Sequence, residues 1–204
     1  MSVGVETNKV FFQGEIISSP QYSHTVKDED FYIFNLKVTR LSGQNDILPV
    51  TISKSLLEQN NVEENKKIAL RGQFRSFNKL EGDKRKLMLS VFVKEVCNEA
   101  EEENSNVIEL DGYICKPVIY RTTPFSREIC DVLLAVNRNF NKSDYIPCIA
   151  WGNNAQTLSK FGVPTKLKLV GRIQSREYVK YVGEEQIPTT KTAYEVSISK
   201  ILIN

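Results

Sequence analysis

Hydrophobic and polar residues alternate along most of this chain, and the alternation predicts strands. The segment 31–40 has an apolar side chain at every second position, and a segment 98 residues further on does the same. A period of two is typical of a strand with one buried face. The predicted inward sets are Tyr32, Phe34, Leu36 and Val38; Leu48, Val50 and Ile52; Cys130, Val132, Leu134 and Val136; Ile146, Cys148 and Ala150; and Leu167, Leu169 and Ile173.

The strand pattern occurs twice. Three residues of the first half recur 98 positions later, and a glycine-centred strand recurs 99 positions later; the pairs are Gly14 and Gly112, Arg40 and Arg138, Pro49 and Pro147, and Gly72 and Gly171. A near-constant offset over this length indicates two copies of one domain. We therefore expect a first domain at 1–97, an acidic linker at 98–105 and a second domain at 106–204.

Each copy is predicted to contain three strands, a short helix and two further strands. The helices are expected at 53–59 and 153–161, and hairpin tips at 81–83 and 182–184. A glycine within the fourth strand permits a sharp bend, so that five strands can close into a barrel. A five-stranded barrel with a helix between strands three and four is the oligonucleotide/oligosaccharide-binding (OB) arrangement. We predict an all-β protein of two tandem OB-fold barrels; the alternative is a small sandwich with the same strand count.

Composition is that of an ordinary soluble protein, with 41% hydrophobic and 25% charged residues among 204. No stretch approaches the ~20 apolar residues of a membrane span, and the N-terminus does not resemble a signal peptide. The four cysteines form no Cys-x-x-Cys pair, which argues against a zinc site and a disulfide-dense secreted module. We expect a cytoplasmic protein with reduced thiols, in which Cys130 and Cys148 are small core residues.

The outward faces of two strands in the second copy collect aromatic and basic residues. Unpaired bases stack on exposed rings at about 1–3 kcal/mol each, and cations neutralise phosphates. The alternative is that Trp151 caps the barrel and the arginines are ordinary solvated charges. The stacking candidates are Phe140, Tyr145, Trp151 and Tyr178, and the phosphate candidates are Arg138, Lys142, Lys168, Arg172, Arg176 and Lys180.

The first copy lacks most of this set. The equivalents of Phe140, Tyr145, Trp151 and Tyr178 are Ser42, Ile47, Ser53 and Lys79. Weaker contacts are expected from Arg71, Arg75, Phe77 and Lys79. The second domain, with 13 basic and 9 acidic residues over 104–204, is the one suited to a polyanion. We infer that it binds strongly, whereas the first domain binds weakly or serves in assembly.

Catalytic motifs are missing from the sequence. His24 is the single histidine and lies in a polar connection, where we expect a surface loop residue. There is no Gly-rich phosphate loop and no dinucleotide-binding turn. We interpret the acidic runs as solvent-exposed charge rather than as general acids. We therefore expect no catalytic residues, no metal, no cofactor and no enzymatic activity.

Three segments of the second copy carry more specific motifs: SREICDVLLAVNRNFNKSDYIPCIAWGNNAQTLSKF, LKLVGRIQSREY and AYEVSISKI. They contain a third strand that ends in aromatic-Gly before a helix, a Gly-Arg-hydrophobic fourth strand and a closing Glu-Val strand. With these motifs, residues 106–203 resemble the bacterial single-stranded DNA-binding protein family. The first copy resembles it more faintly, through FYIFNLKVTR, DILPV and LRGQFRS, so the chain looks like a tandem-OB member of Gram-positive type.

The resemblance implies stacking aromatics at Phe140, Tyr145, Trp151 and Tyr178, in agreement with the strand pattern. It also implies an assembly of four OB folds, which for this chain is a homodimer. Members of the family usually end in an acidic tail that recruits other enzymes, whereas this chain ends in SKILIN. Recruitment through such a tail is therefore not expected.

The leading hypothesis is sequence-tolerant binding of single-stranded DNA in replication, recombination or repair, without catalysis. One alternative is an OB-fold interaction module of a replication, primosome or mobile-element complex, with nucleic-acid binding secondary. RNA is another candidate ligand, because base stacking does not depend on the sugar. No membrane partner is expected.

Overall fold

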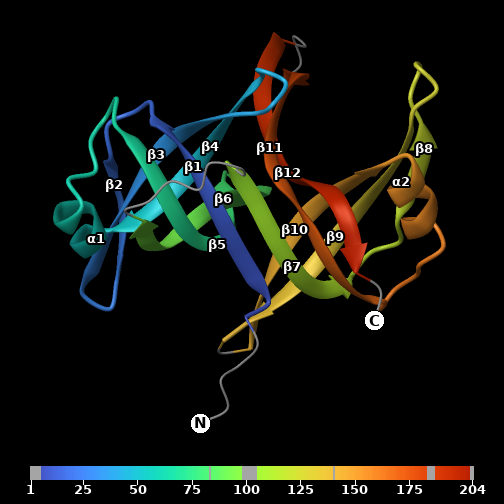
Figure 1. The fold of residues 1–204 in the computed structure, drawn as a ribbon, viewed down its shortest axis with the longest axis horizontal. Coiled ribbons are helices and arrows are strands. Elements are labelled where there is room, and N and C mark those ends of the chain that lie inside the picture. The colour runs from blue at the N-terminus through green and yellow to red at the C-terminus, as the bar shows by residue number, and fades with distance from the viewer. Residues whose placement is uncertain (1–5, 83, 98–104, 140, 183–186, 203–204) are drawn as a thin grey trace.

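The computed structural model describes residues 6–82, 84–97, 105–139, 141–182 and 187–202 (Figure 1). The first repeat comprises β1 (Asn8–Ile16), β2 (Gln21–Val26), β3 (Glu29–Thr39), β4 (Asn45–Ser53), α1 (Lys54–Gln59), β5 (Lys67–Glu81) and β6 (Lys84–Cys97). The second comprises β7 (Asn106–Ile114), β8 (Ile119–Thr122), β9 (Glu128–Arg138), β10 (Lys142–Trp151), α2 (Asn153–Leu158), β11 (Lys166–Val182) and β12 (Ile187–Leu202). Most of the predicted linker, residues 98–104, lies outside the described residues.

Each repeat closes into a five-stranded barrel. In the first repeat β1 pairs with both β3 and β5, β3 pairs with β4, β5 pairs with β6, and a parallel pairing of β4 with β6 completes the circle. The second repeat has the same pairings among β7, β9, β10, β11 and β12. A sandwich would leave two separate sheets, so the predicted barrels are confirmed and the alternative is wrong.

The barrel interiors contain the side chains that the alternation assigned to them. All the predicted inward residues are buried except Tyr32, which is partly buried against the core. Cys130 and Cys148 are both core residues, and burial raises the pKa of the Cys148 thiol. The helices lie where expected, with Ser53 as the N-cap of α1, although α2 ends at Leu158 rather than at residue 161. No helix in the described ranges is long and apolar enough to cross a membrane.

The structure adds a short strand to each repeat that the sequence pattern did not predict. β2 and β8 form hairpins with β3 and β9. The expectation that His24 lies in a loop is wrong, because it lies on β2. Every residue of both strands is exposed, so neither strand has the buried side that produces an alternating pattern.

The two mid-strand glycines bend β5 and β11 as predicted. The register of β5 against β6 shifts between Arg71 and Gly72, and that of β11 against β12 shifts between Val170 and Gly171. A Cβ atom at either glycine would overlap a carbonyl oxygen on the neighbouring strand. Only glycine therefore permits the close approach at which each strand turns from one side of its barrel to the other.

The two barrels join edge to edge through β1 and β7, which merge all strands into one 12-stranded sheet. Val10 pairs with Ile108, its own equivalent at the offset of 98, and Asn8 pairs with Leu110, the equivalent of Phe12. An antiparallel pair of equivalent residues defines a local twofold axis between the repeats. We call the contact around this axis the seam.

Hydrogen bonds on both sides of the seam repeat this symmetry. The Ser175 N–H donates to Asp46 Oδ1 at 2.8 Å, and the Ser76 N–H donates to Asp144 Oδ1 at 2.8 Å. Asp46 also pairs with Arg40 of its own repeat, at 2.6 and 2.7 Å, and is fully buried. A buried carboxylate is tolerated only where such donors compensate its charge. The seam is therefore a polar contact with one defined geometry.

We expect Asp46→Ala to lower the free energy of unfolding by about 3–5 kcal/mol, because it strands the Arg40 guanidinium and the Ser175 N–H. The matched control is Asp131→Ala. Asp131 pairs with Arg121 at 2.9 Å on the surface, with side chains 34% and 52% exposed. Its loss should cost less than about 1 kcal/mol. Urea unfolding of the three proteins measures both values; equal costs would contradict this account of the seam.

Candidate nucleic-acid interface

The predicted aromatic residues of the second repeat are exposed to solvent. Trp151 is 41% exposed, Tyr145 44% and Tyr178 39%. Trp151 is the last residue of β10, and the next residue, Gly152, has a φ of 52° that turns the chain into α2. This left-handed turn leaves the indole at the rim of the barrel. Trp151 is therefore not sealed under the helix, and part of the indole is open to solvent.

A groove of about 1150 Å³ runs from Trp151 to the seam. β11 and β12 form its floor, and the β3–β4 loop of the first repeat forms its far wall. In Figure 1 the blue β3–β4 hairpin reaches the red β11–β12 hairpin, which agrees with the contacts between β4 and β11. The lining residues that matter here are Arg40, Leu41, Gln44, Arg127, Trp151, Arg172, Gln174, Ser175 and Arg176.

The groove carries positive charge that the protein does not neutralise. Neither Arg127 nor Arg172 has a carboxylate within ion-pairing distance among the described residues. Burial, and then the nearby Arg40, lower the pKa of Arg172, with Asp46 acting in the opposite direction, and the side chain stays charged at neutral pH. Uncompensated arginines around a hollow attract anions.

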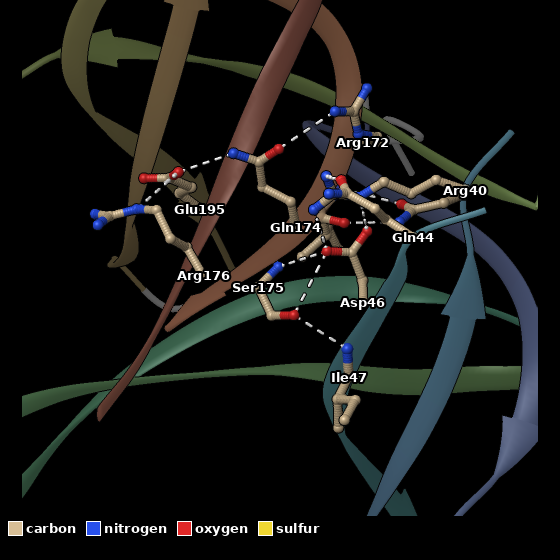
Figure 2. Close-up of polar contacts among 11 residues, drawn as sticks. Arg40, Gln44, Asp46, Ile47, Arg172, Gln174, Ser175, Arg176 and Glu195 are labelled. Atoms are coloured by element: carbon tan, nitrogen blue, oxygen red, sulfur yellow. Dashed lines mark hydrogen bonds and ion pairs between the residues drawn. The ribbon is translucent and has the colours of Figure 1, made fainter. Parts of the chain in front are cut away.

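A chain of polar contacts holds the floor of the groove in place (Figure 2). Arg172 donates to Gln174 Oε1 at 3.4 Å, and Gln174 Nε2 donates to Glu195 Oε1 at 2.8 Å. Glu195 also lies 3.8 Å from Arg176 Nε. Because Gln174 is buried and hydrogen-bonded through both Oε1 and Nε2, Arg172 and Arg176 are held on either side of it, each two positions from Gln174 on one face of β11.

The structure brings together only part of the predicted set. Arg176 lies 5.9 Å from the Tyr178 ring, next to the groove. Tyr145 lies at the seam, where its N–H donates to Ser76 Oγ at 2.7 Å. Lys168 lies opposite Asp111 in the pairing of β11 with β7, beyond the Gly171 bend and away from the groove lining. Lys142 begins β10 and Lys180 lies on the β11–β12 hairpin, both exposed. Phe140 lies outside the described residues.

Arg138 is the phosphate candidate least available to a ligand. It lies on the opposite side of the seam, 3.6 Å from the buried Asp144. Its Nε is buried without a hydrogen-bond acceptor in the part of the chain that the structure describes. The repeat offset makes Arg138 the equivalent of Arg40. The two arginines therefore mark two symmetry-related ends of the seam, which we call junctions: one with Arg40 and Asp46, and the opposite one with Arg138 and Asp144.

The first-repeat counterpart of the groove is occupied by a row of flat side chains. Arg75 lies over the Phe92 ring at 3.7 Å, Phe92 lies 5.5 Å from Phe31, and Phe31 stacks on His24 at 5.2 Å. Of the other predicted weak contacts, Arg71 lies over the ring of Phe11 on β1, and Phe77 and Lys79 are exposed on β5. The second-repeat equivalents of Phe92 and Arg75 are Ser197 and Gln174, which leave that groove open.

Sequence reasoning missed two groove residues, Arg40 and Arg127. Arg127 is an exposed residue directly before β9, with no motif around it. The sequence marks Arg40 only as a repeated residue, and nothing in one repeat indicates which residues of the other will lie beside it. The only available signal was the repeat itself, which marks Arg40 and Arg138 as equivalent.

The fold and the groove define a tandem OB-fold protein with a basic, partly aromatic groove. A model described as the single-strand binding protein family matches residues 105–203. Single-stranded DNA-binding protein 1 of Streptococcus pyogenes serotype M18 is 33% identical over 100 residues, covering 46% of this chain and 77% of that protein. The single-stranded DNA-binding protein of Enterococcus faecalis is 34% identical over 86 residues, covering 39% of this chain and 46% of that protein.

This chain belongs to the single-strand binding protein family. The region that matches the family model is the second repeat. The crystal structure of the single-stranded DNA binding protein from Thermus aquaticus covers 96% of this chain and 91% of its own, with a TM-score of 0.74 and 18% identity. That similarity extends the shared fold to both repeats.

The single tryptophan makes the charge of the groove measurable. We expect iodide to quench Trp151 fluorescence more strongly than caesium, because the surrounding arginines concentrate anions. Arg172→Gln should reduce the difference, whereas Lys9→Gln, which removes a charge from β1 on another face, should not. Added salt should remove the difference by screening. Equal quenching by the two ions in the wild-type protein at low salt would contradict a positive groove.

Proposed function

We propose that this protein binds single-stranded DNA with little sequence preference and without catalysis. In this proposal bases stack on Trp151 and Tyr178, while Arg172, Arg176 and Lys180 neutralise phosphates. The observation that carries it is the exposed indole in one groove with Arg127 and Arg172, neither of which has a carboxylate within ion-pairing distance among the described residues. The names of the relatives in Streptococcus and Enterococcus point to the same ligand.

The groove chemistry favours unpaired strands over a duplex. Every base has a face that can stack on an aromatic ring, so stacking tolerates any sequence, but in a duplex those faces are hidden. Phosphate neutralisation releases counterions and is equally independent of sequence. Arg127, which lines the groove beside Trp151, joins the proposed phosphate contacts.

Within this proposal the repeats contribute unequally. Tyr145 and Lys142 would extend the contact along β10 toward the seam, and Lys168 and Arg138 are the weakest candidates. Phe140, which lies outside the described residues, is kept as a stacking candidate. In the first repeat, Phe77 and Lys79 are exposed on the β5–β6 hairpin and are the best placed for a secondary contact, whereas Arg75 is engaged with Phe92.

The wider role proposed is the protection of exposed single strands during replication, recombination or repair. A homodimer with four barrels is part of the proposal and rests on the family resemblance. A native mass near twice 23.3 kDa is expected.

Trp151→Ala should raise the Kd for oligo-dT about fivefold to 150-fold, which corresponds to the ~1–3 kcal/mol of one stacked base. The control is Tyr113→Ala, because Tyr113 is similarly exposed (40%) but lies on β7 outside the groove lining. Anisotropy of a labelled oligonucleotide gives both affinities without relying on the tryptophan.

Wild-type affinity in the Trp151→Ala protein would contradict the proposal that a base stacks on Trp151. A protein that binds no oligo-dT at low salt would overturn DNA binding itself and favour the interaction module. A matched oligo-U in the same titration distinguishes DNA from RNA preference.

A further inference from the structure

Arg40 belongs to the first repeat but lines the groove of the second. It follows β3 directly, and its guanidinium donates from Nε and Nη2 to Asp46 and from Nη1 to Gln44 Oε1 at 3.0 Å. A guanidinium has five N–H donors, so two remain for a ligand. The pairing with the fully buried Asp46 fixes the direction in which Arg40 faces (Figure 2).

Arg172 faces Arg40 across the seam. The two side chains line the same groove, and they lie close enough for Arg40 to disfavour the charge on Arg172, whereas Asp46 favours that charge. Asp46 is the carboxylate at this point, and Arg40 already compensates it. One positive charge is therefore left over at the junction of β3, β4 and β11, and an anion between the two guanidiniums would relieve their repulsion.

We propose that a phosphodiester group of the bound strand lies between Arg40 and Arg172, so that the two repeats together form one binding site. This inference rests on the proposed function, because its ligand is the backbone of the same single strand. It goes further by assigning a contact to the first repeat. The strand then continues from Trp151 along the groove onto the β3–β4 loop, whose Leu41 is fully exposed.

The opposite junction has the same framework but not the same site. Arg138 and Asp144 stand where Arg40 and Asp46 stand, but the equivalent of Arg172 is the uncharged Gln73, and the nearby Arg75 is packed over Phe92. Two further equivalents work against a bound strand there: Trp151 is replaced by Ser53, and Arg127 by Glu29. The opposite junction therefore supplies a matched internal control.

The test uses charge-neutral double variants of the full chain. Arg40→Gln with Asp46→Asn removes one charge of each sign, so the net charge stays that of the wild type, and the amide Oδ1 can still accept the Ser175 N–H. We expect the slope of log K against log salt for oligo-dT to decrease in magnitude by about 0.7, the value for one phosphate contact on a single strand. Asp46→Asn alone should leave the slope intact and the affinity equal or higher.

Arg138→Gln with Asp144→Asn is the control and should leave the slope unchanged. Arg172→Gln, an exposed change that strands no buried carboxylate, should also lower the slope by about 0.7. It keeps the test valid if the seam variant does not fold. Combining Arg172→Gln with the Arg40 double variant should give little further loss, because both arginines hold the same phosphate.

An unchanged slope in the Arg40 and Arg172 variants would overturn the shared phosphate site. So would equal losses at the two junctions, which would indicate a general effect of the seam. Fully additive losses from Arg40 and Arg172 would mean two separate phosphates and would also overturn it. Each of these results leaves oligo-dT binding by the wild type intact, so none of them can be mistaken for failure of the proposed function.

Discussion

Two buried aspartates determine how the barrels meet. Asp46 and Asp144 each accept the backbone N–H of a serine from the other repeat, Ser175 and Ser76, and each lies beside an arginine of its own repeat. A buried carboxylate without these donors would be costly, so the repeats are held in one register. That register places the β3–β4 loop against β11. The groove exists because the seam has this geometry.

The two repeats have the same backbone fold and differ in the side chains at the groove positions. At equivalent positions the second repeat has Ser197 and Gln174 and leaves a groove, whereas the first has Phe92 and Arg75 and fills the space with stacked groups. A ring whose face is already covered by a guanidinium is not free for a base. The divergence between the repeats is therefore a difference in side-chain volume on a shared strand framework, and it leaves the groove of the second repeat open.

Much of the fold was predictable from the sequence because burial leaves a periodic pattern. The alternation located the barrel strands, the repeat located two copies, and the glycines located both bends. β2 and β8 were missed for the same reason, since strands exposed along their whole length carry no such pattern. Within the site, strand parity correctly placed Trp151, Tyr178 and Arg176 on the outside. Parity could not separate Lys168 from them, because the bend at Gly171 redirects the strand without changing its alternation.

The sequence by itself determined the class of fold, the doubling of the domain and the outward placement of the aromatic and basic residues, because each depends on local periodicity along one strand. The tertiary structure alone decided which of those residues share a groove. It brought Arg40 and Arg127 to Trp151, moved Tyr145 to the seam and packed Arg75 onto Phe92. These neighbours are distant in sequence, and only barrel closure and the register of the seam set how far apart they lie.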